Sequence, residues 1–168
     1  MQPTIPAPDD KIQTARSYPH PFQGAGHTEA RQVPVLLHRA RDAMATRMRL
    51  IFDPYNLTDP QWRVLRLLSI EDEIDAADLA TRAFLLGPSL SRIVRDLSER
   101  GLILRRASKE DARRYLHSIT PDGMKLVREI VPQFDPLYER IERELGIKDL
   151  QRLNTTMERL AEILSETP

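Results

Sequence analysis

Hydrophobic residues recur three and four positions apart along much of this chain, which is the period of an amphipathic helix. Residues 33–52 show this repeat, and Pro54 ends it. Residues 147–166 carry a second stripe of the same kind. The pattern therefore predicts one long helix on the N-terminal side of the chain and another at the C-terminal end.

Between these two stretches, capping residues mark the starts of two shorter helices. Thr58 is a favourable N-cap, Pro60 sits in the first turn, and Gln61 takes the third position of a capping box. Asp75 is the cap of the next helix, in which small and apolar residues suit tight packing. Both helices are expected to end before the chain breaks at Gly87.

A further helix is expected to start at Pro88 and to end at a C-terminal cap, Gly101. Its apolar positions face inward, and its short polar and arginine positions face outward. Two alternating segments, residues 102–107 and 115–120, then predict a hairpin with a charged tip. The order helix, helix, two-stranded ribbon is that of a winged helix-turn-helix.

The segment after the hairpin predicts a long helix over residues 121–146. It should bend near Pro132 and Pro136, because proline removes a backbone donor and crowds the preceding turn. The predicted fold class is mainly α with a small β-ribbon, with the winged helix-turn-helix over residues 57–120. Residues 1–30 hold five of the 13 prolines and predict a flexible arm.

Composition excludes several classes of protein. The 168 residues include no cysteine, so disulfides, thiolate metal sites and cysteine catalysis are excluded. Four scattered histidines and the lack of a glycine-rich phosphate loop leave no constellation for an enzyme, a metal or a cofactor. Neither a secretory signal nor a membrane-spanning run is present in the sequence, which predicts a cytoplasmic protein.

Positive charge is concentrated in one part of a chain that is neutral overall. Lys plus Arg and Asp plus Glu are 25 each, yet Ala80–Arg114 holds nine basic and four acidic residues. Asp53–Leu79, directly before it, holds two basic and seven acidic residues. A local excess of cations on a helix and a ribbon is the electrostatic footprint of a nucleic-acid-binding protein.

The helix after Gly87 has the outward-facing side chains that base contact in a DNA major groove requires. The ribbon could add phosphate contacts or enter the minor groove. The alternative is that these cations form a solvated helix face and a soluble turn, as most charge runs do. The candidate DNA contacts are Pro88, Ser89, Ser91, Arg92, Arg95, Arg106, Lys109, Arg113 and Arg114.

The capped helix and the basic region closely resemble the MarR family of bacterial transcription regulators, over roughly residues 33–164. The resemblance is carried by LTDPQWRVLRLLS and by DLATRAFLLGPSLSRIVRDLSERGLILRRASKEDARRYLHSITPDG. Within these, QWRVLRLL and GPSLSRIVRDLSERGLI look most like the branch that regulates homoprotocatechuate and related aromatic-acid catabolism. The family's wing pattern, D-x-R-R followed by L-T-x-x-G, is present as Asp111, Arg113, Arg114, Ile119, Thr120 and Gly123.

This resemblance implies an obligate homodimer. Residues 31–56 and 121–168 of both chains would form the dimerisation helices, and each winged helix would bind half of a palindromic operator in double-stranded DNA. The terminal helices carry more apolar surface than a small winged helix can cover, which agrees with a dimer. Within the family pattern, Asp111 is expected to pair with an arginine and stabilise the wing, leaving Arg113 to reach the groove.

The resemblance also implies a small-molecule effector, since relatives are commonly released from DNA by small aromatic acids. Such a ligand needs a cation or other donors for its carboxylate and apolar walls for its ring. The candidates are His38, Arg41, Trp62, Arg63 and Arg66. Alternatively, Trp62 is a core residue, His38 an interface histidine, and the arginines are partners of Asp42, Asp72 or Glu73.

The sequence thus predicts a sequence-specific DNA-binding regulator, a repressor of an aromatic-acid catabolic operon released by an aromatic acid, a phenolic acid or its thioester. The rival hypothesis is a protein-interaction module whose basic ribbon docks an acidic protein surface. Steep salt dependence together with operator preference would favour DNA binding over that rival.

Overall fold

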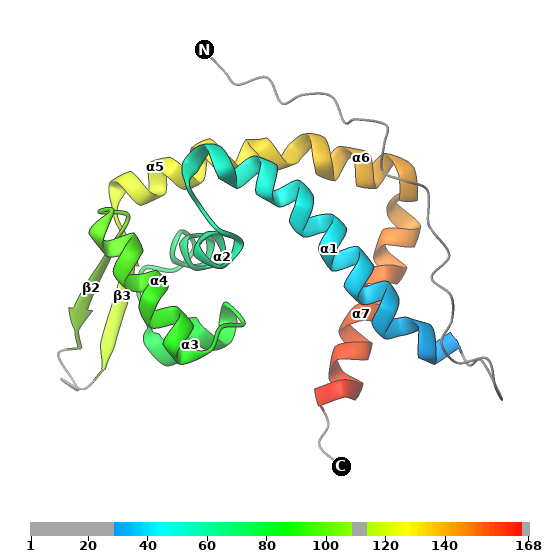
Figure 1. The fold of residues 1–168 in the computed structure, drawn as a ribbon, viewed down its shortest axis with the longest axis horizontal. Coiled ribbons are helices and arrows are strands. Elements are labelled where there is room, and N and C mark those ends of the chain that lie inside the picture. Colours follow the sequence, from blue (N-terminus) through cyan, green and yellow to red (C-terminus); the bar gives the residue numbers. More distant parts are fainter. Residues whose placement is uncertain (1–28, 109–113, 166–168) are drawn as a thin grey trace. The chain divides into compact units, whose positions relative to one another are not determined.

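A computed structural model describes residues 29–108 and 114–165. The chain divides into two compact units, residues 1–39 and 40–168, and each is described by itself. Figure 1 shows the elements in chain order. The predicted arm, residues 1–30, lies outside the described residues except for its last two positions.

The first unit contains a short 3₁₀ helix, η1 (Glu29–Gln32), and the start of α1 (Val33–Phe52). The bounds of α1 are those predicted from the hydrophobic repeat. Leu36, in this unit, is 51% exposed despite its apolar side chain. The last residues of α1, Ile51 and Phe52, belong to the second unit and are buried there.

The second unit holds the winged helix-turn-helix and a C-terminal helical segment. The observed fold class is the predicted one, mostly helical with a small antiparallel sheet, and none of the described helices is long and apolar enough to cross a membrane. The elements are η2 (Asp53–Tyr55), α2 (Asp59–Leu68), β1 (Ile74–Asp75), α3 (Ala76–Arg82), α4 (Gly87–Glu99), β2 (Ile103–Ala107), β3 (Tyr115–Ile119), α5 (Pro121–Ile130), η3 (Val131–Phe134), α6 (Asp135–Leu145) and α7 (Ile147–Ser165).

Side-chain caps fix the starts of α2 and α3 as predicted. At α2, the Gln61 backbone N–H donates to Thr58 Oγ1 at 3.4 Å, and the Thr58 N–H donates to Gln61 Oε1 at 2.8 Å. Asp75 Oδ1 accepts from two backbone N–H groups in the first turn of α3, at 2.9 and 3.1 Å. These bonds satisfy donors that a helix start otherwise leaves unpaired. The predicted caps Thr58 and Asp75 are therefore confirmed.

The sheet has one strand more than the predicted ribbon. β2 and β3 form the expected antiparallel hairpin, and β1 pairs with the other edge of β3, giving the order β1-β3-β2. Ile74 of β1 lies opposite His117, which also faces Arg105 of β2. β1 is only two residues long, so no alternation of apolar and polar residues could reveal it.

The predicted bend in the C-terminal helix is present. α5 passes into the 3₁₀ turn η3, which contains Pro132, and α6 then begins with Pro136 in its first turn. Gly146 ends α6 with a φ of 78°, the left-handed region that favours glycine. The expected single long helix is thus three consecutive helical elements.

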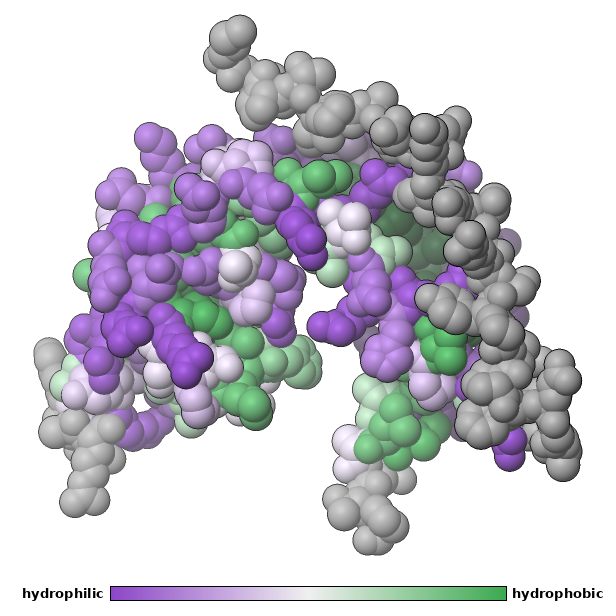
Figure 2. Space-filling model, viewed as in Figure 1, coloured by the Kyte–Doolittle hydropathy of each residue, from purple (hydrophilic) through white to green (hydrophobic). Residues whose placement is uncertain are grey.

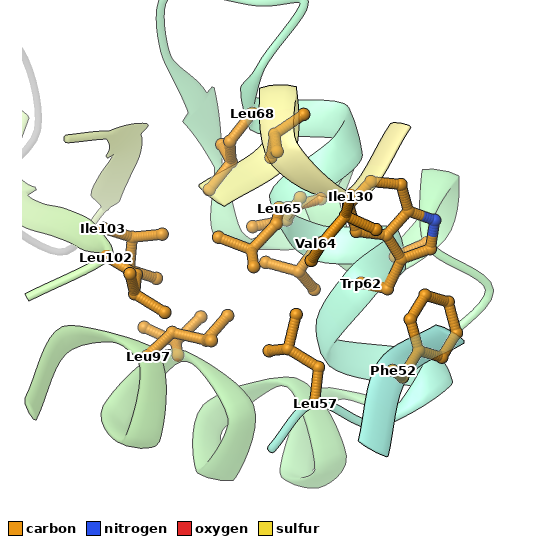
Figure 3. Packing of buried hydrophobic residues seen from close by; sticks show 14 of the residues in the cluster. Phe52, Leu57, Trp62, Val64, Leu65, Leu68, Leu97, Leu102, Ile103 and Ile130 are labelled. Carbon is orange, nitrogen blue, oxygen red and sulfur yellow. The ribbon is translucent and has the colours of Figure 1, made fainter. Parts of the chain in front are cut away.

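The hydrophobic core of the second unit lies between α2, α4, the start of β2 and α5 (Figure 3). Val64, Leu65, Leu97 and Ile130 are completely buried, and Ile103 is nearly so. These residues come from separate parts of the sequence, so the core holds α4, the wing and α5 in one body. The remaining core residues labelled in Figure 3 are Phe52, Leu57, Trp62, Leu68 and Leu102.

One glycine of the family's wing pattern has a clear packing role. A Cβ at Gly123 would overlap the carbonyl oxygen of Leu102, because the first turn of α5 lies directly against the start of the wing. Thr120 Oγ1 closes the same junction by donating to the Gly101 carbonyl at 2.7 Å and accepting from the Gly123 N–H at 3.0 Å. The T-x-x-G part of the pattern therefore fastens the wing to α5.

Candidate nucleic-acid interface

The outer face of α4 carries four polar side chains that the sequence predicted to face outward. Ser89, Ser91, Arg92 and Arg95 are all exposed, whereas Leu90, Val94 and Leu97 are buried in the core. The Ser91 hydroxyl donates to the Gly87 carbonyl at 3.1 Å. Among the described residues, neither Arg92 nor Arg95 has a carboxylate partner. Both guanidinium groups therefore keep their donors available for a ligand.

Polar contacts fix α4 relative to the helix in front of it. Gln61 Nε2 donates to Asp96 Oδ2 at 2.7 Å, which joins the start of α2 to the inner flank of α4. Arg100, just after α4, donates to the carbonyls of Asn56 and Tyr55 at 2.9 and 3.0 Å. Asp96 also lies 3.6 Å from Arg100, so three side chains tie α4 to α2 and to the junction before it.

Two of the hairpin arginines are paired with the acidic segment before them. Arg106 Nε donates to Glu73 Oε1 at 2.5 Å, and its Nη2 bonds to the second carboxylate oxygen. Arg114 Nη2 bonds to Asp75 Oδ2. The Asp75 carboxylate thus has two roles, because it caps α3 and also pairs with Arg114 of the wing. Hydrogen bonds from the backbone of Asp78 and, to a smaller extent, from Arg114 lower the pKa of Asp75.

These pairs change the interpretation of the charge pattern. The acidic run before α3 and the basic run after it are not separate surfaces, because Glu73 and Asp75 lie against the hairpin, and Glu71 pairs with Arg82 at 2.8 Å. Both Arg106 and Arg114 were predicted DNA contacts, and in the structure each has a carboxylate partner. A paired cation attracts a phosphate less strongly than a free one.

The remaining hairpin residues fall into two groups. Arg105, not among the predicted contacts, lies over the ring of Tyr115, with Cζ 3.5 Å from the ring centroid. The predicted contacts Lys109 and Arg113 and the predicted wing-stabilising Asp111 lie outside the described residues. Their roles stay predictions.

A groove of about 610 Å³ lies between the outer parts of α4 and the hairpin. Ser91 and Arg95 line its α4 side, and Arg105, Tyr115 and His117 line its hairpin side. His117 is only 2% exposed, and its Nδ1 has no hydrogen-bond partner among the described residues. Burial lowers the pKa of His117 and outweighs the opposite effect of a hydrogen bond with the Ile74 backbone. Burial at this place in the sheet therefore disfavours the protonated form of the histidine.

The residues predicted to bind an effector have different surroundings. His38 in the first unit, and Arg41 and Arg66 in the second, are exposed. Trp62 is 7% exposed and packs against both Phe52 and Phe134, with ring centroids 5.7 and 5.5 Å away, as the core alternative expected. Its stacking partners could not be identified from their spacing in sequence.

Arg63 joins α2 to the end of α3. Its Nε lies 3.1 Å from Asp59 Oδ2, and its Nη1 donates to the Ala83 carbonyl at 2.5 Å, just after the end of α3. The partner is thus Asp59, one turn earlier on the same helix, rather than Asp42, Asp72 or Glu73. Glu73 instead holds Arg106.

Comparison with known proteins decides the family. A profile of the MarR family matches residues 55–114. The regulator FarR of Neisseria gonorrhoeae is 39% identical over 127 residues, which cover 76% of this chain and 87% of FarR. The chain belongs to the MarR family.

Other MarR relatives agree with this assignment and with the predicted branch. The homoprotocatechuate degradative operon repressor of Escherichia coli is 34% identical over 124 residues, which cover 74% of this chain and 84% of the repressor. The solved structure of NadR in complex with 4-hydroxyphenylacetate superposes with a TM-score of 0.70 at 35% identity, covering 86% of this chain and 99% of NadR. FarR and the E. coli repressor are transcriptional regulators rather than enzymes.

Proposed function

We propose that this MarR protein is a homodimeric, sequence-specific DNA-binding regulator whose α4 enters the major groove. The observation that carries the proposal is the outer face of α4, where two exposed serines and two arginines without a carboxylate partner in the described part of the chain stand on a helix fixed by core packing. The pattern of acceptors and donors in the major groove suits such side chains, because arginine binds guanine bidentately and serine accepts or donates. Pro88 lies in the first turn of α4 and has no backbone N–H, so this position leaves no unpaired backbone donor at the start of the helix.

The hairpin would contact the backbone on either side of that groove. Phosphate contacts need cations but carry no sequence information, so Arg106, Lys109, Arg113 and Arg114 would add affinity and register rather than specificity. Because Arg106 and Arg114 have carboxylate partners, their contribution requires exchange of a carboxylate for a phosphate. We therefore expect α4 to dominate base preference, with the wing supporting it.

Apolar side chains exposed on the C-terminal helices support a dimer. The second unit leaves a stripe of them uncovered along α6 and α7, and Figure 2 shows apolar surface over the end of α7. A two-fold dimer would cover such a stripe and present two copies of α4 to successive major grooves, which predicts a palindromic operator. The stripe consists of Tyr138, Leu145, Ile147, Leu153, Met157, Ile163 and Leu164.

We further propose that a small aromatic acid releases the protein from DNA, which would make it a repressor of an aromatic-acid catabolic operon. NadR, at 35% identity, was solved with 4-hydroxyphenylacetate, and the E. coli relative is named for homoprotocatechuate degradation. Of the candidate residues, His38, Arg41 and Arg66 are exposed cations or donors, while Trp62 and Arg63 already have partners. Substitution of Arg41 or Arg66 by alanine should reduce effector response more than DNA binding.

The decisive experiment is an electrophoretic shift with DNA from immediately upstream of the protein's own gene, with non-specific competitor and a panel of hydroxylated aromatic acids. We expect a specific complex that one class of acid dissolves. A specific complex that no acid disturbs would remove the effector proposal and leave DNA binding. Absence of any specific complex would favour the protein-interaction module instead. Because the chromosome is the proposed partner, the site of action is expected to be the cytoplasm.

A further inference from the structure

The turn that joins α3 to α4 contains an aromatic residue in a backbone conformation that favours glycine. Phe84 has a φ of 52°, in the left-handed region where a Cβ crowds the backbone. Its N–H donates to the Thr81 carbonyl at 3.1 Å, and the Leu85 N–H donates to the Ala80 carbonyl at 2.8 Å. These two bonds are those of a Schellman motif, in which the position of Phe84 is usually glycine.

The same molecule shows the ordinary version of this motif at the end of α4. There the Gly101 N–H donates to the Ser98 carbonyl and the Leu102 N–H donates to the Leu97 carbonyl, both at 2.9 Å. Gly101 has a φ of 70°. The two helix ends thus share one hydrogen-bond pattern, and only the first carries a side chain at the left-handed position. The backbone at Phe84 does not require that side chain.

Burial does not require it either. Phe84 is 87% exposed and Leu86 is 78% exposed, whereas Leu85 between them packs against the core. The turn itself is held by backbone bonds and by Arg63, which binds the Ala83 carbonyl at 2.5 Å. Figure 2 shows apolar surface where α3 turns into α4. The two outward side chains therefore add exposed apolar area without stabilising the fold, and Phe84 does so at an unfavourable backbone position.

Their place in the fold indicates what they contact. Leu86 is the N-cap residue of α4, and its carbonyl accepts from the Leu90 N–H at 2.9 Å. Phe84 precedes it by two residues, and Pro88 and Ser89 follow in the first turn of the helix. The apolar pair is thus continuous with the face proposed to enter the major groove. The apolar feature that a major groove offers is the C5 methyl group of thymine.

We propose that Phe84 and Leu86 form an apolar pair that contacts thymine methyl groups in each half of the operator and sets a preference for T there. This inference rests on the proposed DNA-binding function. It adds a part of the specificity that the serines and arginines of α4 do not supply. Strain and exposure at Phe84 then have a functional reason, as outliers at binding sites commonly do.

The test begins with an operator selected by the wild-type dimer from a random duplex pool. Thymines are then replaced one pair of symmetric positions at a time by deoxyuridine, which removes only the methyl group. At one pair of positions we expect wild-type affinity to fall about fourfold per half-site, the effect of exposing one methyl-sized group. Phe84→Gly should bind the thymine operator more weakly and should no longer distinguish thymine from uracil at those positions.

Two further variants separate binding from folding. Phe84→Gly suits the backbone, so its melting temperature should not fall below that of the wild type. Ile70→Ser, which removes another apolar side chain that is 65% exposed, should leave the methyl dependence unchanged. If Phe84→Gly keeps the full thymine preference, or if it dissociates the dimer, the inference is overturned while operator selection still stands. If the wild type selects no sequence, the proposed function fails first, and this inference fails with it.

Discussion

The arginines of α4 and those of the hairpin have equal charge and different surroundings. Arg92 and Arg95 have no carboxylate partner in the described residues, while Arg106 and Arg114 are paired with Glu73 and Asp75. A free guanidinium can bind a base edge or a phosphate at once, whereas a paired one must first exchange its partner. A count of cations along the sequence therefore overestimates the positive charge available on the wing, where two arginines are paired. For the outer face of α4 the same count is correct.

The largest effect should come from removing the free arginines. Arg92→Ala and Arg95→Ala should each weaken binding to the operator by about tenfold, because each removes a contact of the kind that reads bases. Binding to scrambled DNA should change much less. Fluorescence anisotropy titrations with both duplexes measure this difference. Equal losses with operator and scrambled DNA would show that these arginines bind phosphates and not bases.

A smaller effect of opposite sign should follow from releasing a paired arginine. Glu73→Gln removes the charge that holds Arg106, so the wing should gain one phosphate contact. Affinity for any sequence should rise about fivefold at physiological salt, and the salt dependence should steepen by about one counterion. Glu162→Gln on α7 makes the same change in net charge and serves as control. If both variants behave alike, net charge rather than the pairing of Arg106 is responsible.

Asp75 should show that the wing pairs also support folding. Asp75→Ala removes the cap of α3 and the partner of Arg114, and it should lower the free energy of unfolding by about 1 kcal/mol. For a chain of this size the melting temperature should fall by about 2–4 °C. Asp75→Asn, which keeps a capping oxygen, should lose less. Thermal unfolding followed by circular dichroism measures both.

The charge of Asp75 also predicts a pH dependence. Because its pKa is lowered in the folded protein, its contribution is present above the unfolded pKa of about 4 and is lost as the pH falls through the folded value. The difference between the wild type and Asp75→Asn should therefore shrink on acidification below about pH 4. A difference that stays constant down to pH 3 would contradict the ion pair with Arg114.

The smallest effect, a change in the pH dependence of stability, should come from His117, which lies in β3 of the wing. Burial lowers its pKa, so the unfolded chain takes up a proton before the folded one, and stability should decline as the pH falls below about 6.5. His117→Asn should flatten this slope, whatever its effect on stability at pH 8. The matched control is His38→Asn, since His38 is exposed on α1. An unchanged slope in the His117 variant would mean that this histidine is not the titrating group.

Local signals in the sequence were sufficient for most elements of the fold. The capping box at Thr58, the cap at Asp75 and the glycine after α4 each act within a few residues, so their spacing predicts a helix end directly. The faces of α4 were predictable for the same reason, because a helix with buried leucines at three- and four-residue spacing fixes which residues face outward. The DNA-facing candidates on α4 were therefore placed correctly as exposed residues.

The features that the sequence did not reveal depend on contacts between residues that are distant along the chain. β1 exists because Ile74 and Asp75 pair with β3, some forty residues later. Glu73 and Arg106 are likewise separated by 33 positions, so neither composition nor periodicity could join them. Trp62 had both a core and a ligand interpretation, and its contacts with Phe52 and Phe134 favour the core. Burial and partners, not residue type, decide such cases.

The contacts of Arg100 have a consequence for how this regulator can evolve. Arg100 holds the carbonyls of Tyr55 and Asn56 from the end of α4 opposite to Ser89 and Ser91. Substitutions on the outward face of α4 leave that attachment intact, so under the proposed function a gene duplicate could acquire a new operator without rebuilding the joint between α4 and the α1–α2 junction. The residues proposed to recognise DNA are thus different from Arg100, which attaches α4 to the rest of the chain.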